Sequence, residues 1–388
     1  MGRRAYRTTS LAASRRIPAL EGLRGVAATI VVVRHTTNAV TMPVDARRAL
    51  LEGPWAPLLD AQGAVTLFFV LSGFVLAGSV ARGGGRLGLL QFWVKRIFRI
   101  QPPYMAALLA TWAASFAYAV PDAAAPFTNW LRWLASIHLA PSALFASLLY
   151  PGSAGDQLVV GWTLGVEMSW SLLLPLLWIV ARTTHWGVAL ALAAVPLGLS
   201  GMPMWLLYGV DFALGVALWR ERERIRAWLG ALPAAASAGL FTLALVLLSS
   251  PLWLGWHVPS RGVLEPNVLS TGAIALRAPG AALLIALALG FAPWRRVLET
   301  RPALFLGRIS YSLYLLHIGV LLLCTRLIAP ASAASGLLLV GAVLALSIAA
   351  SLAFHRLVER PSVALGNSLC EMLAARLGGK ALRSTPPD

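Results

Sequence analysis

About ten stretches of roughly 20 residues, each almost entirely apolar, follow one another along this chain. A helix needs about 20 such residues to cross the hydrocarbon core of a bilayer, where it also satisfies its own backbone hydrogen bonds. Because 58% of the 388 residues are hydrophobic and only 12% are charged, the chain has too little polar surface for a soluble protein. The sequence therefore predicts an all-α, polytopic membrane bundle of about ten transmembrane helices. The predicted spans are residues 20–41, 61–81, 102–120, 160–181, 185–201, 203–219, 232–250, 271–292, 305–328 and 334–354.

The net charge of +17 is distributed unevenly over the segments that connect these spans. An even number of spans places both termini on one side of the membrane. If that side is the cytoplasm, 24 of the 32 basic residues lie inside and four lie outside, as the positive-inside rule requires. The charge therefore indicates topology and contact with anionic lipid headgroups rather than nucleic acid. It predicts a cytoplasmic basic segment 1–16, a transmembrane domain 17–361 and a mobile cytoplasmic tail 362–388.

Two of the connecting segments have apolar residues at helical spacing. Residues 86–101 are typical of an interfacial amphipathic helix on the inside, with the paired prolines Pro102 and Pro103 marking entry into the third span. Residues 127–139 form a similar pattern on the outside. A span over 130–150 would place the basic cluster at 220–226 outside, so we expect none there. The two cysteines, in a span and in the tail, imply no disulfide.

Arg24 and His35 lie eleven residues apart in the first apolar stretch. At roughly 100° per residue they share one face of a helix, about 16 Å apart along its axis. Ionisable side chains are costly inside a membrane, so two on one stripe indicate a polar cavity or an aqueous path. A neutral imidazole can act as a general base. The alternative is a histidine that only bonds to a neighbouring helix.

Glu167 and Asp211 are acidic residues inside predicted spans. Glu167 is expected at a depth similar to that of His35, where a carboxylate facing the imidazole would hold its tautomer. The alternative is a buried ion pair of Glu167 with Arg34 or Arg277. Asp211 has the same two interpretations with less support.

Further candidates lie at single positions. Arg96 and Arg99, with Lys95 beside them, could clamp a phosphate or could be ordinary charge on the inner side. The Ser72-Gly73 pair lets another helix or a ligand approach closely. His317 could line the cavity or bond to a neighbouring helix. The sequence contains no metal-ligand cluster, no phosphate-binding glycine loop and no serine nucleophile motif.

Taken in order, these segments resemble the membrane-bound acyltransferase family 3, whose members O-acylate surface polysaccharides, lipid-linked sugars and some macrolide sugars. Arg24 and His35 match the family's motif of an arginine followed after ten residues by a histidine. Three departures are Glu21 in place of an aspartate, Trp170 where a phenylalanine or tyrosine is common, and Arg34 beside His35. Arg34 either disfavours the imidazolium or binds an anionic acceptor group. The other matching segments are 17–26, 69–74, the pair Arg96 and Arg99, 163–167, 310–317 and 359–361.

The resemblance implies an acyl-CoA co-substrate, with acetyl-CoA the expected donor, and no permanently bound cofactor or metal. His35 would deprotonate a hydroxyl of a carbohydrate or glycoconjugate acceptor, Glu167 would orient His35, and Arg24 would position the donor. Lys95, Arg96 and Arg99 would hold its phosphates. The chain would then lie in the bacterial inner membrane. The residues expected to bind substrate are Ser72, Arg34, Trp162, Tyr314 and His317.

A second class of function is transport of a glycoconjugate or small metabolite, as a multi-pass carrier or flippase. The intramembrane histidine, glutamate and arginine residues would then form a proton relay or substrate path. Covalent modification of an acceptor distinguishes the enzyme from the carrier. Direct transfer and an acyl-enzyme route both remain open.

Overall fold

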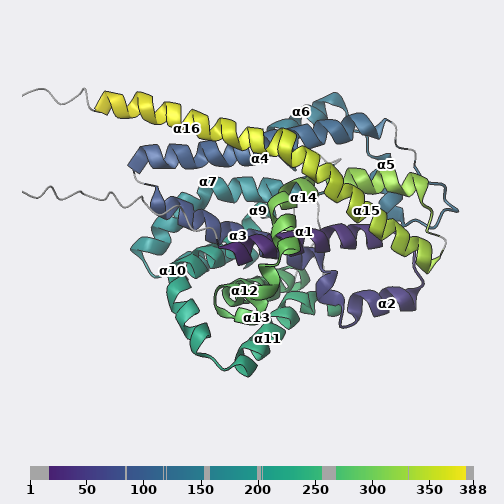
Figure 1. Cartoon of the computed structure of the whole chain (residues 1–388), viewed down its shortest axis with the longest axis horizontal. Coiled ribbons are helices and arrows are strands. Elements are labelled where there is room, and N and C mark those ends of the chain that lie inside the picture. Colours follow the sequence, from purple (N-terminus) through teal and green to yellow (C-terminus); the bar gives the residue numbers. More distant parts are fainter. Residues whose placement is uncertain are drawn as a thin grey trace, which may run out of the picture.

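The computed structural model describes residues 17–381 except for 84, 117, 119, 153–157, 199–201, 203, 256–267 and 331. The described residues are helical throughout apart from short connections and one isolated bridge between Val40 and Phe127. The predicted basic segment 1–16 lies outside them. The helices are α1 (Pro18–Ala39), α2 (Val44–Glu52), α3 (Ala61–Arg82), α4 (Gly85–Ser115), α5 (Asn129–Ser136), α6 (Pro141–Leu149), α7 (Gly161–Thr183), α8 (Trp186–Ala194), α9 (Met204–Leu207), α10 (Gly209–Ala231), α11 (Ala234–Trp253), α12 (Val268–Gly290), α13 (Ala292–Leu298), α14 (Arg301–Leu327), α15 (Ala333–Phe354) and α16 (Arg360–Ala381), with a π-helical turn His355–Glu359 before α16 (Figure 1).

The all-α class is confirmed, and the described chain is a multi-pass membrane protein by the length and composition of its helices. Six helical stretches within the described residues are long and apolar enough to cross a membrane. The number ten and the cytoplasmic side of the termini stay predictions. The segments α5 and α6, with eight and nine residues, are too short to cross, as expected for 130–150. The six stretches are Ala61–Arg82, Gly161–Thr183, Ala234–Trp253, Gly272–Gly290, Arg301–Leu327 and Ala333–Arg376.

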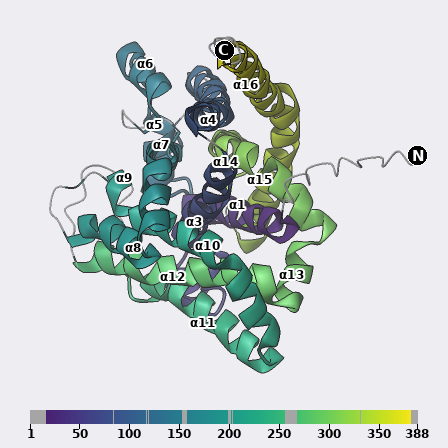
Figure 2. The ribbon, with the colours of Figure 1, turned by 90° about the vertical axis from the view of Figure 1, so that its left-hand side faces the viewer.

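The first helix, α1, lies in the middle of the bundle and packs mainly against α14, with α3 and α15 on its other sides (Figure 2). The close approach depends on glycine. A Cβ atom on Gly25 would lie 2.5 Å from the backbone nitrogen of Gly307, so the two backbones touch where neither residue has a side chain. This packing brings the polar stripe of α1 against α14.

A second close crossing joins α3 to α10. A Cβ atom on Gly73 would overlap the carbonyl group of Phe212. The Ser72-Gly73 pair thus permits helix packing through its glycine. The serine points to the other side of α3, toward the cavity described below.

Two expectations for the segments around α4 need correction. The amphipathic segment 86–101 and the third span form one helix, α4, which continues through Pro102 and Pro103. The tail was expected to be mobile from residue 362, but it is helical as far as Ala381, because α16 continues to that residue and lies along α4 (Figures 1 and 2). The hydroxyl of Ser362 donates to the carbonyl of Phe98, which ties the start of α16 to α4.

Candidate functional site

A cavity of about 880 Å³ with many charged lining residues lies between α1, α3, α4, α7, α14 and the start of α16. Its described lining is strongly cationic, with seven arginine or lysine side chains and three glutamates. A cavity with this excess of positive charge attracts anionic groups. The charged lining residues are Arg24, Arg82, Lys95, Arg96, Arg99, Arg308 and Arg360, against Glu21, Glu167 and Glu359.

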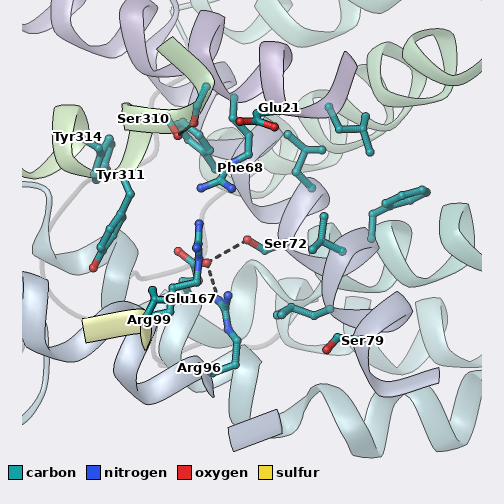
Figure 3. Close-up of a pocket in the computed structure, with 18 of the residues that line it drawn as sticks. Glu21, Phe68, Ser72, Ser79, Arg96, Arg99, Glu167, Ser310, Tyr311 and Tyr314 are labelled. Carbon is teal, nitrogen blue, oxygen red and sulfur yellow. Dashed lines mark hydrogen bonds and ion pairs between the residues drawn. The ribbon is translucent and has the colours of Figure 1, made fainter. Parts of the chain in front are cut away.

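Glu167 forms a buried ion pair with Arg96 on the wall of this cavity (Figure 3). Nη2 of Arg96 lies 2.7 Å from Oε1 of Glu167, and the hydroxyl of Ser72 donates to the same oxygen at 3.1 Å. The guanidinium also donates to the hydroxyl of Ser171 from Nε and Nη2. These hydrogen bonds hold both charges in place where one alone would be costly to bury.

Arg24 and Arg99 differ from Arg96 in having no hydrogen-bond or ion-pair partner among the residues that the structure describes. Both are partly buried and line the cavity, yet neither forms a hydrogen bond or ion pair with a described residue. Figure 3 shows Arg99 beside the Glu167 carboxylate rather than bonded to it. Half-buried guanidinium groups without an acceptor are suited to bind the oxygen atoms of an anionic ligand.

His35 pairs with His317 rather than with Glu167. Nδ1 of His35 lies 2.8 Å from Nε2 of His317, and Nδ1 of His317 lies 2.8 Å from the carbonyl oxygen of Tyr314 and 3.2 Å from that of Leu313. The prediction that Glu167 faces His35 is therefore wrong. Helical spacing placed the two at similar depth, but Glu167 points from α7 toward α4.

The predicted alternative partners of Glu167 are wrong as well. Arg277 is buried in an ion pair with Asp60, whose Oδ2 lies 3.3 Å from Nε of the guanidinium. Asp60 also caps the N-terminus of α3 by accepting from Gly63. This pair joins α12 to α3 away from the cavity lining. Arg34 lies at a separate crevice with Thr37.

Tyr314 lies between the cavity and the histidine pair. It lines the cavity, its hydroxyl is 2.8 Å from that of Thr163, and its ring centroid is 5.9 Å from that of His317. Since Thr163 donates to the carbonyl of Val160, its oxygen accepts from Tyr314. His35 is not among the described lining residues, so the Arg24–His35 stripe does not line one continuous space.

Two further predicted residues lie away from the cavity lining. Trp162 packs against Tyr208 at 5.7 Å between ring centroids, in an aromatic cluster with Phe69. Asp211 is fully buried in α10, and neither of its carboxylate oxygens has a hydrogen-bond partner among the described residues.

A buried arginine–glutamate pair, a histidine pair and a cationic cavity inside a membrane bundle are features of a chemical site rather than of a structural scaffold. Residues 17–356 match the family model of the acyltransferase domain, acyltransferase family 3. The chain belongs to this family. None of the curated proteins and none of the solved structures matches it. It is thus a membrane acyltransferase, as the ordered motifs suggested.

The acyltransferase also has site residues to which the sequence alone assigned no individual role. Ser171 follows Glu167 by four positions, so helical spacing puts both on one face of α7. Glu359 lines the cavity and accepts from the hydroxyl of Ser312 at 2.7 Å, while Nδ1 of His355 lies 3.0 Å from the same oxygen. Ser312 and Glu359 lie in the matching segments 310–317 and 359–361, but their pairing forms only when α14 and the π-helical turn pack. Ser171 lies in no matching segment.

Proposed function

We propose that this acyltransferase moves an acyl group, acetyl in the simplest case, from acyl-CoA to a hydroxyl of a carbohydrate or glycoconjugate. The observation that carries the proposal is the cationic cavity, one of whose lining residues, Tyr314, contacts His317 of the histidine pair. The bacterial inner membrane is the proposed location. The cavity would receive the donor, and His35 would act on the acceptor.

The donor assignment rests on charge. Coenzyme A carries a diphosphate and a 3′-phosphate, and guanidinium groups match phosphate oxygens. Arg24 and Arg99 are the proposed phosphate ligands because they line the cavity and form no hydrogen bond or ion pair with a described residue. Arg96 is already held by Glu167 and Ser171, so its proposed role is to shape the cavity wall. Lys95, which is exposed at the rim, would attract the anion.

The chemistry follows from the position of His35. Its imidazole would take the proton of the acceptor hydroxyl while the hydroxyl oxygen attacks the thioester carbonyl. The C–S bond then breaks, and the imidazolium returns the proton to the leaving thiolate. Donor and acceptor have to meet at near-attack distance. Since Tyr314 lines the cavity and contacts His317, we infer that it lies on the route to His35 and that its hydrogen bond to Thr163 opens during turnover.

The test is binding and turnover by purified protein in nanodiscs. Arg99→Gln removes one charged contact, worth about 1.5–3 kcal/mol, and is expected to weaken coenzyme A binding by about 10- to 100-fold. The matched control is Arg226→Gln, an equal charge change on the exposed part of α10. It is expected to leave binding unchanged.

Acyl transfer is followed with radiolabelled acetyl-CoA and membrane glycoconjugates of the host as acceptors. The proposal is supported if the acceptor becomes labelled and if His35→Ala abolishes this labelling. Gradient-driven uptake into vesicles without covalent change would contradict it and favour a carrier.

A further inference from the structure

The partner of His35 decides which of its two nitrogens can act as a base. His317, at the other side of the 2.8 Å contact, is fully buried and lies on α14. Its own Nδ1 faces two backbone carbonyl oxygens, those of Leu313 and Tyr314. Carbonyl oxygens only accept hydrogen bonds, so Nδ1 of His317 has to carry a proton.

With its proton on Nδ1, a neutral His317 presents a lone pair at Nε2. A doubly protonated His317 would put a full charge into a completely buried position with no carboxylate contact among the described residues. Nε2 therefore accepts, and Nδ1 of His35 donates to it. The only unprotonated nitrogen of His35 is then Nε2.

The ring geometry favours this hydrogen bond. The two imidazole planes differ by 7°, and the centroids are 5.1 Å apart. That separation is close to the nitrogen–nitrogen distance plus two ring radii, so the rings lie edge to edge in nearly one plane. An N–H of one ring then points along the lone pair of the other.

The surroundings also suit a transient charge on His35 rather than on His317. His35 is partly accessible as a residue, whereas His317 is fully buried. Trp130 lies nearly parallel to His35, with centroids 5.7 Å apart and planes 15° apart.

We propose that His317 is a positioning residue that fixes the tautomer of His35, so that Nε2 of His35 is the nitrogen that takes the acceptor's proton. A hydrogen-bonded chain runs from the Tyr314 carbonyl through His317 to His35. It holds the imidazole in one tautomer, as a carboxylate does in other histidine-based sites. It leaves only one charge in the buried pair after proton transfer. The catalytic part of this inference rests on the proposed role of His35, whereas the assignment of the tautomers does not.

The direct test is nitrogen NMR on ¹⁵N-histidine-labelled protein in nanodiscs, at a pH well above the ordinary histidine pKa. The chain has six histidines, and His35→Asn and His317→Gln assign the two signals. Protonated Nδ1 and unprotonated Nε2 in both rings support the proposal. A proton on Nε2 of His35 would overturn it. Because this measurement needs no substrate, it stands even if the proposed donor or reaction is wrong.

The kinetic test compares two neutral replacements. His317→Gln places a carboxamide near the position of Nε2 and can still accept from His35, whereas His317→Leu cannot. We expect kcat of the leucine variant to fall by at least about 100-fold, and that of the glutamine variant to stay within about tenfold of wild type. Thermal unfolding of both variants controls for folding. Equal losses in the two variants at equal stability would contradict the positioning role.

Discussion

The ion pair between Arg96 and Glu167 gives the sharpest test of the site geometry. The perturbation is a double-mutant cycle of Glu167→Gln, Arg96→Gln and the double variant. At 2.7 Å and an effective dielectric constant of about 20, Coulomb's law gives a gross attraction of about 6 kcal/mol. Desolvation offsets part of it, and the side chains keep 11% and 23% of their surface exposed to the cavity.

We therefore expect a net coupling of about 2 to 3 kcal/mol in the free energy of unfolding. Each single variant is expected to lose more free energy of unfolding than this coupling, because it leaves one charge without its partner. The double variant should recover part of that loss. The assay is reversible unfolding in mixed micelles by titration with dodecyl sulfate.

The control cycle uses Arg48 and Glu52, an exposed pair on α2 at 3.3 Å. Such i, i+4 surface pairs couple by about 0.3–0.5 kcal/mol. If the Arg96–Glu167 cycle gave a coupling no larger than this control, the ion pair would be absent in the membrane and the assignment of Glu167 to Arg96 would fall.

Three further outcomes are expected. Gly25→Ala should destabilise the protein by about 1–3 kcal/mol because the new Cβ meets the α14 backbone. Gly239 has open space around it, so Gly239→Ala should be neutral or stabilise the protein by up to about 1 kcal/mol. Chemical unfolding measures both changes. Tyr314→Phe removes the hydrogen bond to Thr163 and should raise the rate of acyl-CoA hydrolysis without acceptor, measured as release of free thiol; an unchanged rate would show that the hydroxyl contact does not close the cavity. Donor affinity should fall steeply between low and high ionic strength in equilibrium dialysis, since Arg24 and Arg99 act through charge; an affinity independent of salt would exclude them as phosphate ligands.

The sequence was sufficient for the all-α membrane class, because apolar length is a local property of each segment. It also located Arg24, Arg96, Arg99, Glu167 and Ser72, which the structure brings to one cavity. Each of these is a polar residue in an apolar or amphipathic helix, where the cost of burial makes it stand out. Ser171 carries no such signal, since a serine is easily accommodated in a membrane helix.

There is a physical reason why the sequence alone could not predict which polar groups pair with one another. Helical periodicity gives the depth of a side chain and its angle relative to others on the same helix, but not the angle between two helices. Glu167 and His35 were matched by depth alone. The rotation of α1 is set by the contact of Gly25 with Gly307, which turns His35 toward α14, while Arg96 binds Glu167 on the side of α4. The small, uncharged residues at the helix crossings thus help to decide which charged residues meet.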